Sequence, residues 1–230
     1  HIMAQAVQRI FPGTKVTIGP VIENGFFYDF DPENPFSEED LVKIENEMKK
    51  IVKENYKFER KEMSAVEAKK MFLDMNEDYK IEIIDDLGVS SVSIYTQGEF
   101  TDLCRGTHLP STGYLKAFKL MSTAGAYWRG DSNKKMLQRI YGVAFPSKKE
   151  LDDYLVMMEE AEKRDHRKLG RQLDLFFLDD HGPGFPFFMP KRVELLNRLQ
   201  EIWRREHGKS GYQEIKTPIM LDKELWEISG

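Results

Sequence analysis

The sequence has 230 residues, and its 34 Lys and Arg against 39 Asp and Glu give a formal net charge of −5 at pH 7. Hydrophobic residues make up 40% of the chain and aromatic residues 12%, which is enough to bury a core and excludes wholesale disorder. The single cysteine excludes an internal disulfide framework, and no apolar run approaches the roughly 18 residues of a membrane span, so we expect a cytoplasmic protein with no membrane partner.

The N-terminal residues predict a helix followed by two strands. Apolar residues have helical spacing over residues 2–11, and a Pro-Gly pair then ends the helix. Because no capping residue precedes this pattern, we expect the chain to begin inside a longer protein. Alternating patterns at 14–18 and 26–30 predict strands on either side of an Asn-Gly turn.

Three further helix starts have a capping box, in which a serine is followed three residues later by an acid. The three serines are Ser37, Ser64 and Ser147. Shorter, β-type patterns predict strands at 80–84, 92–97, 114–120 and 136–143. Residues 1–146 therefore predict an α+β domain that combines helices with antiparallel strands.

The remaining residues predict a connector and the beginning of a second domain. Residues 147–170 have the pattern of one long charged helix. The region 171–230 then predicts an amphipathic helix over 193–207 and a short strand over 212–217, with no closing element. Because about 60 residues cannot easily form an independent core, we expect 171–230 to be a domain that is cut short.

Basic residues are concentrated between positions 116 and 149, where eight of them stand against the single acid Asp131. They are Lys116, Lys119, Arg129, Lys134, Lys135, Arg139, Lys148 and Lys149. Aromatic residues such as Trp128 and Tyr141 are interleaved with them. This combination is typical of surfaces that neutralise phosphates and stack on unpaired bases, although an ordinary hairpin with a basic face would have the same composition.

Cys104 and His108 form the most informative candidate site. A spacing of four residues would place the thiol and the imidazole on one face if the segment were a single helical turn, as zinc ligands often are. A buried thiol beside a hydrogen-bonded histidine would have the same spacing. The sequence contains no Walker-type phosphate loop, no Gly-x-Ser-x-Gly elbow and no carboxylate pair with a spacing that predicts acid–base catalysis.

Four ordered runs resemble bacterial-type threonyl-tRNA synthetases. They are TKVTIGPVIENGFFYDFD (14–31), TDLCRGTHLPSTG (101–113), FKLMSTAGAYWRGDSNKKMLQRIYG (118–142) and RDHRKLGRQLDLF (164–176). The resemblance implies that 1–146 is the editing domain, also called the second additional domain, which hydrolyses serine mischarged onto threonine tRNA. It also implies that 147–170 is a connector and that 171–230 opens the class II aminoacylation domain, with motif 1 at a dimer interface.

The resemblance also assigns residues to the editing site. It implies that His1 matches the second histidine of a His-x-x-x-His motif whose first histidine is not in this sequence. The catalytic residues that it implies are His1, Lys80, Asp102, Cys104 and His108. Substrate binding is implied for Gly19, Tyr28 and Asp102. Contacts with the tRNA acceptor end are implied for Lys119, Arg129, Lys134, Lys135 and Arg139.

The same resemblance implies the cofactors and partners. The full-length enzyme would use ATP, magnesium and zinc and act as a homodimer on threonine tRNA. In this segment no cofactor is expected, because editing in this family works without metal, although His1, Cys104 and His108 form a possible weak metal site. Two other readings remain open. One is a free-standing aminoacyl-tRNA deacylase of the alanyl-editing type, and the other is a tRNA-binding module without activity.

Overall fold

A computed structural model of the chain describes residues 1–218, 220 and 222–229. Residues 219, 221 and 230, which belong to the expected domain at 171–230, lie outside the described residues. The chain divides into two compact units, His1–Val156 and Met157–Gly230. Among the described residues, no helix is both long enough and apolar enough to cross a membrane.

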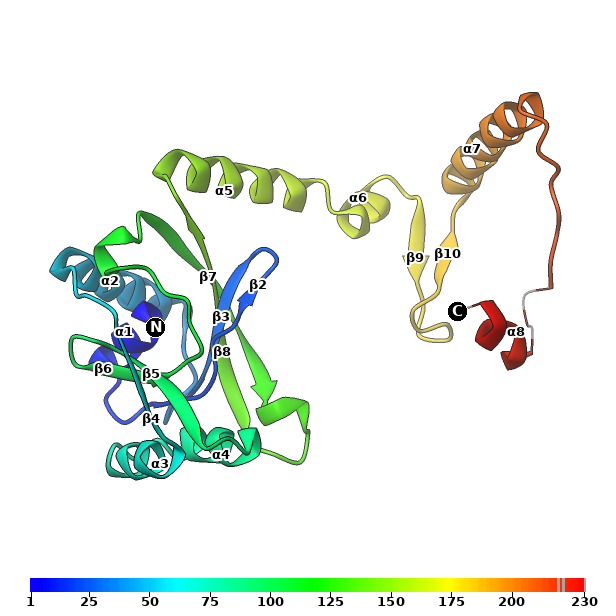
Figure 1. Cartoon of the computed structure of the whole chain (residues 1–230). Coiled ribbons are helices and arrows are strands. Elements are labelled where there is room, and N and C mark those ends of the chain that lie inside the picture. The colour runs from blue at the N-terminus through cyan, green and yellow to red at the C-terminus, as the bar shows by residue number, and fades with distance from the viewer. Residues whose placement is uncertain (219, 221, 230) are drawn as a thin grey trace. The chain divides into compact units, whose positions relative to one another are not determined.

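The larger sheet of the first unit has five antiparallel strands (Figure 1). They are β1 (Lys15–Val16), β2 (Val21–Ile22), β3 (Gly25–Asp31), β7 (Ala117–Tyr127) and β8 (Met136–Phe145). Strand β3 pairs with β1, β2 and β8, and β8 pairs in turn with β7. The strands expected at 26–30 and 136–143 are confirmed, and the one expected at 14–18 is only partly correct, because β1 is limited to Lys15–Val16. The strand expected at 114–120 is only partly correct, because Tyr114 belongs to the short 3-10 helix η1 (Thr112–Tyr114) and β7 starts at Ala117.

A smaller sheet of three antiparallel strands packs against two helices. The strands are β4 (Glu59–Ser64), β5 (Ser91–Gln97) and β6 (Phe100–Leu103), and the helices are α3 (Ala65–Asp74) and α4 (Asp78–Leu87). Phe72, Ile84 and Ile94 are among the buried residues that join them. Of these elements, sequence patterns predict the start of α3 and most of β5 and do not predict β4 or β6. Two antiparallel sheets with packed helices confirm the α+β class.

Helices α1 (Ile2–Ile10) and α2 (Glu38–Glu54) form the main core with the larger sheet. The side chains of Ala4 and Ala6 are fully buried, and their small size lets α1 approach its neighbours closely. The capping boxes expected at Ser37 and Ser64 are both present, and Ser147 makes the expected contacts with Glu150. Helix α1 matters for the site because His1 directly precedes it.

Residues 80–84 lie in helix α4, so the strand expected there is wrong. The apolar residues of this segment fit both the period of a helix and the period of a strand. The segment is a helix, in which Lys80 and Ile84, four residues apart, are both buried. Gly88 ends the helix in the left-handed conformation, with a φ of 59°. The correction changes the site, because α4 points Lys80 into the interior.

Strand β7 is an edge of the larger sheet, because it pairs only with β8 among the described strands. Its register shifts between Leu120 and Ser122. Beside this shift, the buried carboxylate of Glu45 in α2 accepts a hydrogen bond of 3.2 Å from the backbone N–H of Leu120. A side chain of α2 thus occupies a backbone donor on the free edge of the strand.

The C-terminal elements are helices and one hairpin. They are α5 (Lys148–Lys163), which begins in the first unit, α6 (His166–Gln172), β9 (Phe176–Leu178), β10 (Pro186–Phe188), α7 (Pro190–Lys209) and α8 (Lys223–Ser229). The single connector helix expected over 147–170 is wrong. The backbone leaves the helix after Lys163, and Asp165 then caps α6 by accepting a hydrogen bond from the N–H of Arg167.

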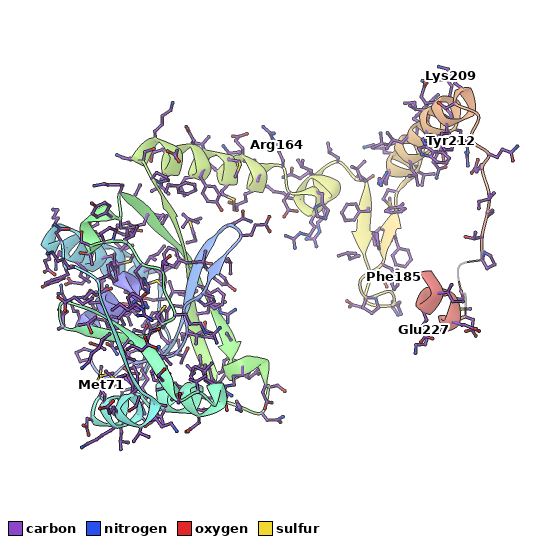
Figure 2. All side chains as sticks on the ribbon, in the orientation of Figure 1. Met71, Arg164, Phe185, Lys209, Tyr212 and Glu227 are labelled. Carbon is purple, nitrogen blue, oxygen red and sulfur yellow. The ribbon has the colours of Figure 1, made fainter. Side chains whose placement is uncertain are left out.

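The second amphipathic helix is confirmed as α7, and none of its residues is buried. The strand expected at 212–217 is wrong, since these residues have no partner strand among the described residues to receive their hydrogen bonds. Tyr212 instead turns back onto the end of α7, where its N–H donates to the carbonyl of His207 and its ring lies 5.5 Å from the imidazole (Figure 2).

Candidate functional site

The first unit contains a cavity of about 760 Å³ lined by residues from both sheets and from α4. His1, Tyr28, Lys80, Asp102 and Cys104 all line it, although they come from distant parts of the sequence. They lie before α1, in β3, in α4, in β6 and directly after β6. The fold therefore brings these sequence-predicted residues together.

Lys80 forms the centre of the cavity floor. Its ammonium donates hydrogen bonds to the carbonyl of Thr17 at 2.6 Å and to the hydroxyl of Tyr28 at 3.0 Å, and it forms an ion pair with Asp102. Two of the three N–H donors of the ammonium thus have hydrogen-bond acceptors, and its charge is paired with the carboxylate of Asp102. The residue is only 2% exposed, and its charge is matched by the equally buried carboxylate.

Asp102 connects Lys80 to the other polar groups of the floor. Its Oδ2 accepts a hydrogen bond of 2.6 Å from Tyr28 and lies 3.3 Å from Nε2 of His1. Burial, together with the negative charge of Asp102, raises the pKa of Tyr28 well above its usual range. The phenol therefore remains a donor at neutral pH, and the floor is an ordered network of hydrogen bonds.

Cys104 and His108 lie on a loop after β6, so the segment is not a single helical turn. The backbone stays extended because the N–H of Cys104 continues the ladder by donating to Ser93. The chain then turns, and the Cys104 Sγ and His108 Nε2 atoms lie 3.2 Å apart. The spacing of four residues thus does bring the thiol and the imidazole together, through a turn of different geometry.

Two aromatic rings hold His108 in place. Phe58 stacks on its imidazole with ring centroids 5.2 Å apart, and Tyr95 packs edge-on at 4.2 Å. Burial lowers the pKa of His108 below its usual 6.5, which keeps the imidazole neutral at pH 7. Phe58 and Tyr95 were not predicted as site residues, since an isolated aromatic residue in a sequence does not indicate which histidine it will contact.

His1, Cys104 and His108 form a set of donors that could hold a metal ion. One ligand atom from each lies within 4.8 Å of the others. His1 also has a buried Nδ1 without a hydrogen-bond partner among the described residues. Two imidazoles and a thiol are ligands that zinc prefers, so the residues fit a zinc site with three protein ligands.

Gly19 lines the same cavity and approaches the ring of Tyr28 very closely. A Cβ atom at this position would lie 2.1 Å from Cδ2 of Tyr28, far inside van der Waals contact. Any side chain here would displace the tyrosine and, with it, a donor to Asp102. The role of Gly19 is thus to leave room for the floor residues.

The basic residues expected to contact RNA each face an acid. Lys119 pairs with Glu45, Lys135 with Asp31, and Arg139 with Asp29. Arg129 and Lys134 lie 3.4 and 3.3 Å from Glu82 of α4, and Arg129 also pairs with Asp86. The excess of positive charge along the sequence is therefore largely balanced in space, which the charge count could not anticipate.

Part of this site matches a known protein family. The model of the threonyl and alanyl tRNA synthetase second additional domain matches residues 92–141, which include Asp102, Cys104 and His108. The whole chain also aligns with curated threonine-tRNA ligases. It is 63% identical to that of Fusobacterium nucleatum, 62% to that of Acetivibrio thermocellus and 61% to that of Carboxydothermus hydrogenoformans.

The chain is homologous to a segment of threonyl-tRNA synthetases. All of its residues are covered by these alignments, but they span only 36–37% of the length of the three relatives. The resemblance expected from the four sequence runs is confirmed.

Proposed function

We propose that the first unit hydrolyses the ester that joins serine to threonine tRNA, which is the editing step of a threonyl-tRNA synthetase. The observation that carries this proposal is the buried Lys80–Asp102–Tyr28 network beside Cys104 and His108. Lys80, Asp102, Tyr28 and Cys104 line a cavity large enough for a nucleoside and its attached amino acid, and His108 lies against Cys104. The homology to threonine-tRNA ligases supplies the substrate.

The two amino acids explain why such a site is needed. Serine lacks one methyl group of threonine, and a hydrophobic pocket discriminates such a difference by only about 1–3 kcal/mol. A second site that accepts serine and rejects threonine can remove the product of the error. Rejection by a clash with the extra methyl group suits a floor as tightly filled as that around Gly19.

Substrate binding is assigned to the floor of the cavity. Asp102 provides a carboxylate on the floor of the cavity, and this carboxylate can bind the ammonium of the seryl group. Tyr28 and Lys80 fix the orientation of this carboxylate. His1 and Cys104 line the same cavity and limit the space for the side chain of the amino acid.

His108 is assigned the role of general base. Its imidazole is neutral at pH 7, and its position is fixed by Phe58 and Tyr95. It takes a proton from water as the water oxygen attacks the ester carbon; the bond to the ribose oxygen then breaks and that oxygen is protonated. The positive charge of Lys80, which is held in place by Thr17 and Tyr28, is assigned the stabilisation of the developing oxyanion.

The longer enzyme is proposed to charge threonine tRNA with ATP, magnesium and zinc, as a homodimer in the cytoplasm. In this proposal residues 1–146 form the editing domain and 147–170 the connector. Residues 171–230 begin the class II domain, with α7 as the helix of motif 1. Threonine tRNA is the proposed partner of both activities. Lys119, Arg129, Lys134, Lys135 and Arg139 are proposed to contact its acceptor end.

A second candidate function is a zinc-dependent deacylase of the alanyl-editing type. The donor set of His1, Cys104 and His108 favours it, since all three ligand atoms lie within 4.8 Å of one another. In that case the metal would supply the activated water.

Deacylation assays separate the candidates. The purified chain is incubated with seryl-, threonyl- and alanyl-tRNA, with and without a chelator. Selective loss of serine that the chelator does not affect supports the editing proposal. Loss of alanine that the chelator abolishes supports the zinc-dependent deacylase. Binding of tRNA without any hydrolysis would contradict both and identify a binding module.

A further inference from the structure

The cavity has two regions of different chemistry. Its floor is polar and holds Lys80 and Asp102, whereas its outer wall is apolar and includes Ile83, Leu87 and Val89. An apolar wall of this kind can pack against a nucleobase, as the hydrophobic linings of ligand pockets do. A ligand that reaches the floor with its amino acid would therefore place its terminal nucleoside against the outer wall.

The charges that line the cavity do not balance. Lys80 is paired with Asp102 on the floor, and Arg60 lies 3.6 Å from Glu62 near the outer wall. Arg105 also lines the cavity and is exposed, but it forms no ion pair and no side-chain hydrogen bond with any residue that the structure describes. It therefore leaves one uncompensated positive charge in the lining.

Arg105 differs in this respect from the basic residues of the β7–β8 hairpin. Arg129 and Arg139, for example, would have to give up a carboxylate before they could bind a phosphate, and Arg105 would not. Its backbone is held next to the floor, because the preceding residue, Cys104, exchanges hydrogen bonds with Ser93 of β5. A guanidinium carried on an anchored backbone suits the bidentate recognition of a phosphate.

We propose that Arg105 binds the phosphate on the 5′ side of the terminal nucleoside of the aminoacylated RNA. The inference rests on the proposed editing function, because it takes the seryl group on the floor as the fixed point. Arg105 is then a positioning residue: it holds the RNA end so that the ester lies beside His108, and it takes no part in the chemical step.

The test compares substrates with and without that phosphate. Seryl-adenosine lacks it, and the seryl ester of the dinucleotide CpA contains it. We expect Arg105→Gln to raise the KM for the dinucleotide ester about tenfold or more, with kcat nearly unchanged, and to leave seryl-adenosine unaffected. Arg105→Lys should restore part of the affinity. Arg60→Gln, which removes the paired arginine of the same cavity, is the matched control and should have a smaller effect.

Two outcomes would overturn the inference. Equal losses for both esters would mean that Arg105 supports the floor or the fold, and unchanged kinetics for both would mean that it contacts no phosphate. A binding arm keeps the test independent of hydrolysis: the unsubstituted chain should bind 5′-AMP more tightly than adenosine, and Arg105→Gln should remove the difference. If no seryl ester is hydrolysed, the editing proposal fails, while the binding arm still decides whether Arg105 recognises this phosphate.

Discussion

The carboxylate of Glu77 accepts a hydrogen bond of 3.0 Å from the backbone N–H of Val16, which joins strand β1 to the start of helix α4. Its other oxygen accepts one of 2.6 Å from Gln8 of α1, and the residue is 5% exposed. Lys80 lies one turn further along α4 and donates to Thr17, the neighbour of Val16. Glu77 therefore fixes the distance between helix α4, which carries Lys80, and strand β1.

Removing this carboxylate should damage the fold and the site together. We expect Glu77→Ala to lower the free energy of unfolding by about 1–3 kcal/mol, because the buried N–H of Val16 loses its acceptor. Glu77→Gln retains an acceptor and should stay close to the unsubstituted protein. Urea unfolding and hydrolysis of seryl-tRNA measure the two effects. Equal stability of the alanine and glutamine variants would contradict the role given to this contact.

The pH dependence of Glu77 has a definite sign. Burial raises the pKa of Glu77 above its usual range, so the folded state favours its protonated form. The stabilisation that the protonated Glu77 side chain gives the folded state is therefore complete below the unfolded pKa of about 4.5. It is lost as the pH rises through the pKa of Glu77 in the folded state. The difference in unfolding free energy between the unsubstituted protein and Glu77→Gln should shift in favour of the glutamine variant as the pH rises from 4 to 7. An unchanged difference would show that the carboxyl has the same pKa in both states.

The Lys80–Asp102 pair should show strong coupling. Lys80→Met alone leaves a buried carboxylate without its cation, which costs about 3–5 kcal/mol of stability. Adding Asp102→Asn removes that charge and should recover much of the loss, whereas hydrolysis should stay low in the double variant. Urea unfolding of the single and double variants gives the coupling energy. Hydrolysis that recovers together with stability would mean that the pair serves only the fold.

His108 should set the acid limb of the hydrolysis rate. A general base is active when deprotonated, so the rate should be flat near pH 7–8 and fall as the pH drops through the pKa of His108, which burial holds below 6.5. His108→Ala should lower the rate about 10²–10⁴-fold. The control is His166→Ala, an exposed histidine of α6, which should change neither rate nor profile. An acid limb that persists in His108→Ala would assign the base to another group.

Zinc should inhibit the proposed hydrolysis. Coordination by His1, Cys104 and His108 would take the lone pair that His108 uses as a base. We expect added Zn²⁺ to lower the rate, a chelator to restore it, and Cys104→Ser to be less sensitive to the metal. Activation by Zn²⁺ would instead favour the zinc-dependent deacylase.

Glu82 should compete with RNA for basic residues of the β7–β8 hairpin. It lies 3.4 Å from Arg129 and 3.3 Å from Lys134 and accepts a hydrogen bond of 3.0 Å from the indole of Trp128. Glu82→Gln keeps an acceptor for the indole, frees Lys134 and leaves Arg129 paired only with Asp86, so we expect tighter tRNA binding. Lys134→Ala should weaken binding and reduce the slope of log K against log salt by about 1. Glu159→Gln makes the same change of charge at a pair with Lys163 in the second unit and is the control.

Local signals in the sequence predict only part of this protein. The capping box at Ser37 and the Pro-Gly stop after α1 depend on neighbouring residues, so they can be read directly. The apolar residues around Lys80 fit both the helical and the strand period, and only packing against β5 decides between the two. The pairing of Lys80 with Asp102 depends on how α4 meets β6, which no short pattern contains. Only the family resemblance indicates from sequence that these two residues belong to one site.

The contact between Glu45 and Leu120 has a consequence for self-association. An open strand edge is a template onto which another chain can add, and β7 is such an edge. A carboxylate that occupies one of its N–H groups blocks intermolecular strand pairing at that point. Burial opposes ionisation of Glu45, but hydrogen bonds from Lys49, Lys119 and Leu120 hold the pKa of Glu45 below its usual range, so this protection persists at neutral pH and weakens in acid. The same side chain that joins α2 to β7 thus leaves one N–H fewer with which another strand could pair.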